Sequence, residues 1–331
     1  MADPPGIDPG YVADLARARE RTGLDEAVLT GCGRLRGRQV AVVVSEFGFL
    51  AGSIGVAAGE RLVRAVERAT RERRPLVAAS ASGGTRLQEG TVAFLQMVKV
   101  AAAIADHRKA GLPYLVYLRH PTTGGVLASW GSLGHVTAAE PGALIGFLGP
   151  RVYEALHGQP FPPGVQVAEN LYAKGLVDAV VTPAELAEVA ARVLEVLCGP
   201  REVPQVGEPP ADDQVGHTPV AEAIRRSRRP DRPGVRALLR VAARDVTPLS
   251  GTAAGELDPG VLLALACFGA APCILLGQDR HRQRRQQPLG PAGLRAARHP
   301  HRHRARPATG DGYRHRRGGP VQGGRGGRAG R

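Results

Sequence analysis

The sequence has few of the residues that mark metal-binding, disulfide-stapled or membrane-spanning proteins. Of its 331 residues, 4% are aromatic, with one tryptophan, two methionines and four cysteines. Cys32, Cys198, Cys267 and Cys273 form no CxxC pair of the kind that holds zinc, so we expect no metal and buried free thiols. No apolar run reaches about 18 residues, and no basic segment leads into an apolar one near the start. We therefore expect a soluble, cytoplasmic protein with no membrane partner.

Net charge is nearly absent from most of the chain. Although the formal charge is +14, residues 279–297 carry +4 and residues 298–331 carry +9, which leaves the first 278 residues close to neutral. The basic end has neither periodicity nor interleaved aromatic residues, so we do not expect nucleic acid as a partner. A genuine basic tail that binds nucleic acid or an acidic surface is the alternative interpretation of this segment.

The first two hundred residues alternate short β-branched runs with longer amphipathic ones. This alternation predicts an α/β fold. Strands are expected at 38–47, 74–82 and 112–120, with weaker strands in HVTAAE, ALIGF and LVDAVV, and helices are expected at 52–73, 86–110 and 183–197. After these elements, a stretch rich in proline and acidic residues is typical of a linker. The following stretch from TPVAEAI to VAARD predicts helices, and the apolar GVLLALACFGAAPCILLGQD closes the second unit.

Two pairs of glycines stand where an expected strand gives way to an expected helix. The stretch SASGGTRLQEG carries Gly83 and Gly84, and HPTTGGVLASWGSLG carries Gly124 and Gly125. Glycine has no β-carbon to keep a ligand from the backbone, and the first N–H groups of a helix lack intrahelical partners. Because neither stretch matches GxxxxGK[ST] or GxGxxG, we expect two oxyanion-stabilising positions in preference to a nucleotide site. The same spacing also fits glycines that only permit tight turns, and the residues alone leave both interpretations open.

Longer motifs resemble a known family. SASGGTRLQEG, LRHPTTGGVLASWGSLGHVTAAEPGALIGFLGPRVYE and ENLYAKGLVDAVV resemble the β subunit of the acetyl-CoA carboxylase carboxyltransferase, in the crotonase-like superfamily. The resemblance runs from about Gly23 to Leu197 and implies an α/β crotonase/ClpP-like carboxyltransferase fold. EFGFLAGSIGVAAGE resembles the family's glycine-rich turn before its first long helix, with Ala51 in place of a usual glycine and Ile54 in place of a usual methionine. The β subunit of this family usually begins with a zinc ribbon of four cysteines. No such ribbon precedes Tyr11 in this sequence, so we expect no metal here either.

The resemblance implies transfer of a carboxyl group from carboxybiotin, carried on a partner protein, to acetyl-CoA, which gives malonyl-CoA for fatty acid synthesis. The acyl-CoA passes through an enolate, whose charge backbone N–H groups would stabilise. The resemblance assigns the catalytic oxyanion hole to Gly83 and Gly84, with Thr85. The residues expected to bind substrate are Gly52, Ser53, Ser82, Arg86, Gly124, Gly125, Gly146 and Arg151.

Several polar and aromatic residues near these motifs also have simpler interpretations. An ion pair of Arg86 with Glu89 on a first helical turn is favoured over a direct catalytic role. His120 and His135 are expected to be packing or surface residues and not ligands. Trp130, the one tryptophan of the chain, is expected in the core.

The second unit resembles the start of the partner α subunit, in the stretches RRPDRPGVRALLRVAARD, VLLALACFGAAPCILLGQDR and PLGPAGLRAAR. The resemblance therefore predicts a β subunit fused to an incomplete second α/β unit. The expected parts are an N-terminal extension (1–22), a β-subunit-like carboxyltransferase domain (23–198), a linker (199–217), a truncated α-subunit-like segment (218–298) and a disordered basic tail (299–331).

The composition of the tail breaks with this pattern. Residues 299–331 contain no Leu, Ile, Phe or Met, whereas the α subunit would continue with an apolar strand and a glycine turn for the biotin carbonyl. Back-translated with GC-rich codons from Arg298 and read one base later, the tail permits GIRIATELGLPLVTVIDTAG, which supplies both. An out-of-frame tail therefore explains the composition and the missing strand together, and resequencing near codon 298 decides between it and a genuine tail.

These expectations define the partners and the alternatives. The resemblance implies a biotin carboxyl carrier protein, a biotin carboxylase and an α-subunit-like carboxyltransferase unit, assembled as a homo- or hetero-oligomer. Because the α-like part is incomplete, we expect weak or absent activity of this chain unless an intact α partner is supplied. The alternatives are the β subunit of a malonate decarboxylase, which shares the scaffold, and a non-catalytic subunit that only binds partners. The sequence does not rank acetyl-CoA against propionyl-CoA.

Overall fold

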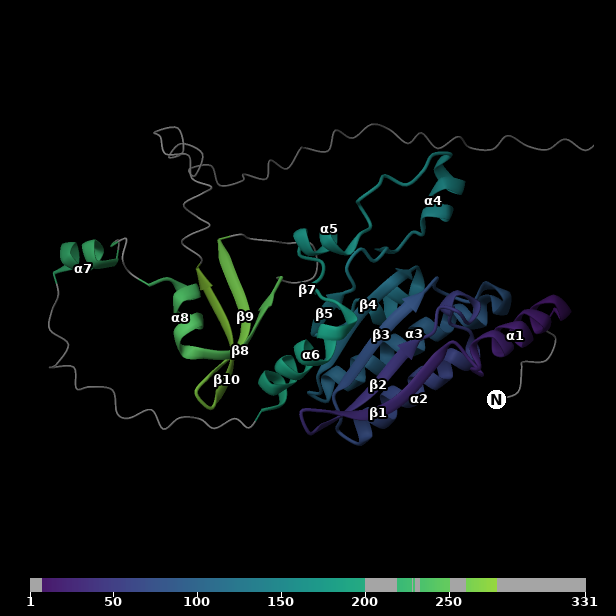
Figure 1. The fold of residues 1–331 in the computed structure, drawn as a ribbon, viewed down its shortest axis with the longest axis horizontal. Helices are drawn as coiled ribbons and strands as arrows, with labels where there is room; N and C mark the ends of the chain where they lie inside the picture. The colour runs from purple at the N-terminus through teal and green to yellow at the C-terminus, as the bar shows by residue number, and fades with distance from the viewer. Residues whose placement is uncertain (1–7, 200–218, 228, 230–232, 251–259, 279–331) are drawn as a thin grey trace, which may run out of the picture. The chain divides into compact units, whose positions relative to one another are not determined.

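The structure is a computed structural model that describes residues 8–199, 219–227, 229, 233–250 and 260–278. All of them belong to the first of the two compact units of the chain, residues 1–286. Apart from Gly199, the expected linker lies outside the described residues, as do the end of the expected α-subunit-like segment and the whole of the expected disordered tail. The described residues form two β-sheets with flanking helices (Figure 1).

Seven strands make up the larger sheet, in the order β1–β2–β3–β4–β5–β7, with β6 paired to the end of β4. β1 and β2 form an antiparallel hairpin, and the other pairs are parallel. The three main strands predicted from the sequence are confirmed, although β4 continues to Thr123. The strands are β1 (Val28–Leu35), β2 (Arg38–Ser45), β3 (Leu76–Ser82), β4 (Tyr114–Thr123), β5 (Val136–Ala139), β6 (Ile145–Gly146) and β7 (Ala179–Val180).

Helices cover both faces of this sheet. Every residue of β3 is buried, as expected for a parallel strand between two helical layers. Helices α2 and α3 share a core with alternate residues of β3 and β4, and α6 shares another core with the intervening residues, such as Leu115. The helices are α1 (Pro9–Thr22), α2 (Val56–Arg71), α3 (Gly90–Lys109), α4 (Pro150–His157), α5 (Ala168–Ala173) and α6 (Pro183–Cys198).

The cysteines depart in part from the expectation of buried thiols. All four are free, and Cys267 is buried, whereas Cys198 and Cys273 are half-buried. Cys32 is exposed because it lies on β1, an edge strand whose residues after Val28 are almost all exposed. The prediction is therefore wrong for Cys32. Its neighbour across the hairpin is Ala41 of β2.

The smaller sheet is antiparallel, in the order β10–β9–β8, and follows two helices. Its elements are α7 (Val220–Ser227), α8 (Val235–Ala242), β8 (Ala243–Leu249), β9 (Val261–Phe268) and β10 (Ala271–Gln278). The helical pattern expected through VAARD ends early, at Ala242, and β8 takes over. The ARDVTPL stretch pairs with β9 instead, and Asp245 has φ +53°, far from the value of a right-handed helix. None of the described helices is both long and apolar enough to cross a membrane.

Candidate active site

The first glycine turn leaves the end of β3 and leads into α3 by way of a short 3₁₀ segment, η2 (Leu87–Glu89). The two glycines of this turn are not equivalent. Gly84 has φ +109°, a conformation that side chains disfavour, whereas Gly83 has an ordinary φ and room for a β-carbon. Both amides are engaged within the chain: Gly83 N–H donates to Ala51 O at 2.8 Å, and Gly84 N–H donates to Ser82 Oγ at 3.0 Å.

The second glycine turn leaves the end of β4. Here the first glycine, Gly124, has positive φ (+65°) and donates to Gly146 O at 3.2 Å and to Phe147 O at 3.0 Å. The expected helix is short, because after Gly125 and Val126 the chain forms one wide π-helical turn, η3 (Leu127–Gly131). The glycine turn is held by the hydrogen bonds of Gly124 N–H to the carbonyls of residues 146 and 147, at the end of β6 and directly after it.

The two turns lie against each other, although 40 residues separate them in the sequence. A β-carbon on Gly84 would lie 3.3 Å from Gly125 N and 3.4 Å from Thr123 O. Conversely, a β-carbon on Gly124 would lie 3.3 Å from Gly83 O, and one on Gly125 would lie 3.0 Å from Thr85 Oγ1. The close approach explains why glycine is needed at Gly84 and Gly124. The interpretation of these glycines as residues for tight packing is therefore correct for part of the motif.

Two backbone donors at this junction remain unused within the chain. Among the residues that the structure describes, neither Thr85 N–H nor Gly125 N–H has a hydrogen-bond acceptor. Gly125 stands in the first turn of a helical segment, where N–H groups have no intrahelical partner. Because the turns are in contact, these donors belong to one small region at the carboxyl ends of β3 and β4, the edge where open α/β sheets bind ligands. Such donors suit an oxygen that carries negative charge.

The amides predicted to form an oxyanion hole differ in their hydrogen bonds. The amides of Gly83 and Gly84 were expected to be its donors, but each already donates to an atom of this chain. Of the three residues expected to be catalytic, only Thr85 has a free amide, and Gly125 joins it from the second turn. Gly83 N–H holds the turn to the preceding loop at Ala51, and Gly84 N–H holds it to the side chain of Ser82 at the end of β3.

That loop, residues 51–54, is the scaffold of the first turn. Gly52 has φ +61°, and a β-carbon there would lie 2.1 Å from Ala81 O, so no other residue fits without a backbone shift. The Gly52 carbonyl accepts a hydrogen bond from Ser82 Oγ at 2.6 Å. Ala51 has φ +55°, a left-handed conformation that costs a residue with a side chain about 1–2 kcal/mol. The usual glycine of the resembled family at this position fits that backbone better.

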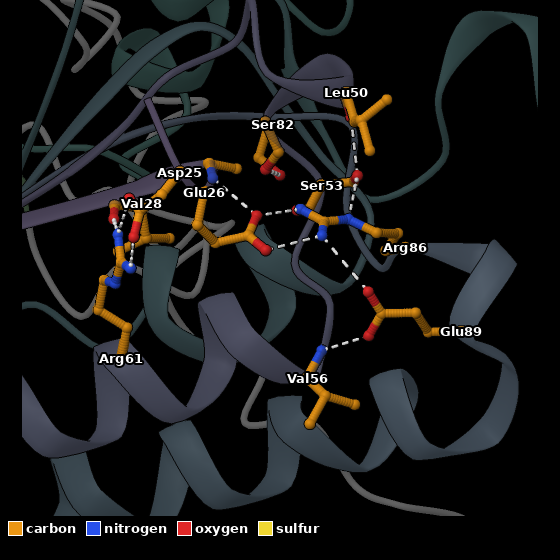
Figure 2. A network of polar contacts seen from close by, with 12 residues as sticks. Asp25, Glu26, Val28, Leu50, Ser53, Val56, Arg61, Ser82, Arg86 and Glu89 are labelled. Carbon is orange, nitrogen blue, oxygen red and sulfur yellow. Dashed lines mark hydrogen bonds and ion pairs between the residues drawn. The ribbon is translucent and has the colours of Figure 1, made fainter. Parts of the chain in front are cut away.

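The side chain of Arg86 anchors the turn to this loop and to the start of the chain (Figure 2). The guanidinium is fully buried, donates to Glu26 Oε2 at 2.9 Å and to Ser53 O at 2.7 Å, and lies 3.3 Å from a carboxylate oxygen of Glu89. Burial alone would lower the pKa of Arg86, but the hydrogen bonds and charge of Glu26 raise it above its ordinary value. The expected Arg86–Glu89 pair is confirmed, whereas a direct substrate contact of Arg86 does not fit, because protein atoms occupy its donors.

Sequence reasoning missed two members of this network. Tyr11, placed in the expected N-terminal extension, lies on α1, is buried and donates to Glu89. Burial first, and then the hydrogen bond to Glu89, raise the pKa of the Tyr11 hydroxyl. Glu26, in the connection between α1 and β1, is 4% exposed. No periodicity or motif marks either residue, because their roles arise from contacts across 60 residues or more.

The other predicted residues are placed as follows. The first turn brings together Gly52, Ser53 and Ser82, and Gly146 lies beside the second turn. The side chain of Arg151 is not among those that the structure describes. Trp130 is fully buried in the core, as predicted. His135 accepts a hydrogen bond from Tyr114 N–H at 3.0 Å, and the exposed His120 accepts one from Leu144 N–H at 3.1 Å, which confirms packing and surface roles. In the described part of the chain, no three His, Cys, Asp or Glu side chains gather as a metal site would require.

The fold and the paired turns define the class of the protein. A family model described as the carboxyl transferase domain matches residues 11–278, which is most of the chain. The chain therefore belongs to the carboxyl transferase domain family. This assignment agrees with the α/β carboxyltransferase fold predicted from the motifs.

Two curated relatives make the comparison more particular. The chain is 60% identical over 291 residues to the "Probable biotin-dependent acyl-coenzyme A carboxylase beta3 subunit" of Mycobacterium tuberculosis (strain ATCC 25618 / H37Rv), a match that covers 87% of this chain and 58% of that protein. It is 45% identical over 210 residues to the "Acetyl-coenzyme A carboxylase carboxyl transferase subunit beta" of Maricaulis maris (strain MCS10), covering 63% of this chain and 68% of that protein. The chain thus spans little more than half the length of the mycobacterial relative.

Solved structures share the fold. A single-chain, multi-domain long-chain acyl-CoA carboxylase superposes with a TM-score of 0.59 at 21% identity, covering 78% of this chain and 25% of that chain. A transcarboxylase 12S with methylmalonyl-coenzyme A and methylmalonic acid bound superposes with a TM-score of 0.58 at 20% identity, covering 76% of this chain and 49% of that chain. At this level of identity the comparison establishes the fold alone.

Proposed function

We propose that this chain is the β-subunit-like carboxyltransferase component of a biotin-dependent acyl-CoA carboxylase. In this role it holds an acyl-CoA, to which a carboxyl group is transferred from biotin carried on a partner protein. The observation that carries the proposal is the pair of unused amides, Thr85 and Gly125, on two facing turns at one edge of the sheet. The relatives that are 45% and 60% identical bear names of such subunits, which supports the same assignment.

The chemistry requires a place for negative charge. When the α-carbon of an acyl-CoA loses a proton, charge develops on the thioester oxygen, and backbone donors already in position stabilise it without reorganisation. Thr85 N–H and Gly125 N–H are the donors that we assign to that oxygen. The glycines at 84 and 124 allow the two turns to lie against each other, and we propose that both donors serve one atom. Carboxybiotin would supply the carboxyl group when its carrier protein is bound, and the biotin left after that group departs would accept the proton from the α-carbon.

The acyl group and the cellular role are finer proposals. We propose acetyl-CoA as the substrate that accepts the carboxyl group, malonyl-CoA as the product and fatty acid synthesis in the cytoplasm as the setting. The name of the Maricaulis relative supports acetyl-CoA, whereas the mycobacterial relative is named only for acyl-coenzyme A. Propionyl-CoA is therefore the competing substrate to measure.

A second subunit-like unit completes the proposed assembly. The start of α3 and the preceding segment present exposed apolar side chains next to the first turn, at Leu87, Val92, Phe94, Leu95 and Val98, which are 53–84% exposed. Phe147, next to the second turn, is 66% exposed. Apolar side chains gathered around a site are typical of a surface that another subunit covers. We propose that an α-subunit-like carboxyltransferase unit covers it, together with a biotin carboxyl carrier protein and a biotin carboxylase that supply the carboxyl group.

The test is a carboxyl-transfer assay with the full chain, carboxylated carrier protein and acetyl-CoA, with and without an added α-subunit-like unit. We expect malonyl-CoA to form when that unit is present and the Gly84→Ala chain to form much less. As a matched control, Gly31→Ala alters an exposed strand glycine with open space around it. Absence of malonyl-CoA in every combination, or equal activity of Gly84→Ala, would contradict the proposal.

One observation favours a second candidate, a subunit that binds acyl-CoA and partners without turnover. The amides of Gly83 and Gly84 are committed within the chain, which leaves fewer donors than the sequence predicts. Binding of acetyl-CoA without product in the complete assay identifies this candidate. Release of CO₂ from malonyl substrates would instead identify the malonate decarboxylase alternative.

A further inference from the structure

A buried cluster of three charged side chains lies directly behind the first glycine turn. Its members are Arg86, Glu26 and Glu89, whose side chains are 0%, 4% and 7% exposed (Figure 2). Tyr11 also contacts it, because its hydroxyl donates to Glu89 and accepts from Arg86 Nη1 at 3.3 Å. Side chains from α1, from the connection before β1 and from η2 therefore meet at one guanidinium.

The cluster holds one positive and two negative charges, so Arg86 alone does not neutralise it. Glu89 has a further partner for its charge, because its second oxygen accepts a hydrogen bond from Val56 N–H at the start of α2. The partial positive charge at a helix N-terminus stabilises a carboxylate there. The hydroxyl of Tyr11 donates to the other oxygen. Glu89 thus joins α1, α2 and the turn through a single carboxylate.

The cluster is connected to the free amide of Thr85 by bonds on both sides of that residue. Ile54 N–H donates to Gly84 O at 2.9 Å, and Arg86 N–H donates to Ile54 O at 3.0 Å. The guanidinium of Arg86 holds the same loop at Ser53, through the carbonyl at 2.7 Å and Oγ at 3.3 Å. The side chain of Arg86 and the peptide group that carries Thr85 N–H are therefore held by the same loop, at Ser53 and Ile54.

We propose that Arg86 is a positioning residue, locked by Glu26 and Glu89, whose task is to aim the Thr85 amide at the reacting oxygen of the substrate. This inference rests on the proposed function, since it assumes that Thr85 N–H meets an acyl-CoA oxygen. It gives Glu26 and Tyr11 roles in the site without any contact with substrate. Preorganised donors lose most of their effect when their direction is no longer fixed.

The experiment compares bound thioester carbonyls in the full chain by difference infrared spectroscopy with carbonyl-labelled [1-¹³C]acetyl-CoA. A donor aimed at the carbonyl oxygen lowers the stretching frequency of the bound thioester. We expect this lowering in the unaltered chain and a much smaller lowering in Glu26→Gln, which keeps the shape of the side chain but removes its charge. Acetyl-CoA affinity should change by less than about threefold, because the cluster does not touch substrate. Glu26→Asp should restore part of the shift.

Asp25→Asn is the matched control, because Asp25 is the neighbouring acid and pairs with Arg61, away from the cluster. It should leave the carbonyl shift unchanged. If Glu26→Gln does not fold, as judged by thermal unfolding, Tyr11→Phe is used instead, since it removes one hydroxyl and keeps all three charges. It should reduce the shift by a smaller amount.

The outcomes separate the two proposals. An unshifted carbonyl in the unaltered chain contradicts the proposed function itself. A shifted carbonyl in the unaltered chain that persists in full in Glu26→Gln and in Tyr11→Phe overturns the positioning role of Arg86 and leaves the proposed function standing. A fall in acetyl-CoA affinity by tenfold or more in Glu26→Gln, with the shift retained, would also overturn it, because Arg86 would then act on binding.

Discussion

The two glycine turns look alike in the sequence, yet the structure holds them in different ways. The turn at Gly83 and Gly84 is held by backbone bonds to residues 51 and 54 and, in addition, by buried side chains. Ser82 Oγ accepts a hydrogen bond from Gly84 N–H, and the cluster of Arg86, Glu26 and Glu89 holds the residues that follow. The turn at Gly124 and Gly125 is held through Gly124 N–H, which donates to the carbonyls of residues 146 and 147, and through Ser129 Oγ, which donates to Gly125 O at 2.6 Å; among the described residues, no charged cluster takes part. Each turn keeps one donor free of the chain, at Thr85 and at Gly125.

The difference teaches which glycines the geometry requires. In each pair only one residue has positive φ, namely Gly84 in the first turn and Gly124 in the second. Those two residues also make the close contact between the turns. Gly83 and Gly125 have ordinary φ, so the backbone conformation does not require glycine at these two positions. Each GG motif therefore combines one glycine that the backbone conformation requires with one glycine of ordinary φ.

The largest effect should come from breaking the scaffold of the first turn. Gly52→Ala places a β-carbon 2.1 Å from a backbone carbonyl at φ +61°, and we expect a loss of about 3–5 kcal/mol in the free energy of unfolding. Gly146→Ala, beside the second turn, meets the flexible side chain of Gln166 at 2.3 Å and should cost less than half as much. Urea denaturation measures both, and equal losses would contradict the distinction between the turns.

The next effect concerns the contact between the turns. Gly84→Ala needs a β-carbon at φ +109°, only 3.3 Å from Gly125 N, and should lower carboxyl transfer by about a hundredfold. Gly125→Ala faces side-chain atoms of Thr85 and Met97 at 3.0–3.3 Å without a strained φ, and should lower transfer by about tenfold. Rates of malonyl-CoA formation compare the two chains. A larger loss for Gly125→Ala would reverse our ranking.

A smaller effect is expected at Ala51, in the loop of residues 51–54 that supports the first turn. Ala51→Gly relieves a left-handed conformation but adds chain entropy to the unfolded state, so we expect a gain of about 0–1 kcal/mol in stability. The melting temperature should rise slightly or stay constant, with transfer activity retained. A clear loss of stability would show that the side chain of Ala51, near Gly83, contributes packing that outweighs the strain.

The smallest effect concerns Asp25, the exposed acid next to Glu26 of the buried cluster. The hydrogen bond from Arg61 lowers the pKa of Asp25 to about 2, so this pair contributes stability above the ordinary pKa and loses it as pH falls toward 2. Because Asp25 is largely exposed, the contribution should stay below about 1 kcal/mol. Unfolding measured at pH 5 and at pH 3 should show a slightly larger drop for the unaltered chain than for Asp25→Asn. An equal drop in both chains would show that the Asp25–Arg61 pair does not contribute to stability.

The sequence predicted the parts of the fold that depend on local pattern. The buried strands at β2, β3 and β4 follow from short apolar runs, and α6 follows from its helical spacing. The capping box at Thr182 and Glu185, which the structure shows at the start of α6, was not part of the prediction. The helix α1 and the hairpin strand β1 were not expected. β1 is mostly exposed and carries no alternation of polar and apolar residues that would mark it.

For the site, the sequence located the turns but not the donors. Glycine spacing and the family resemblance indicated Gly83, Gly84, Gly124 and Gly125, and the structure brings these residues together. Which amides are free depends on hydrogen-bond acceptors such as Ala51 O, Ser82 Oγ and Gly146 O, and the tertiary structure sets the positions of these acceptors. The roles of Tyr11 and Glu26 depend on it in the same way.

The most direct test of the central claim is the infrared carbonyl frequency of labelled acetyl-CoA bound to the unaltered chain and to Gly84→Ala. We predict a lower frequency than in water for the unaltered chain, and a frequency close to that in water for Gly84→Ala with acetyl-CoA still bound. An identical frequency in both chains would contradict the assignment of the paired turns as the place where the thioester oxygen is held.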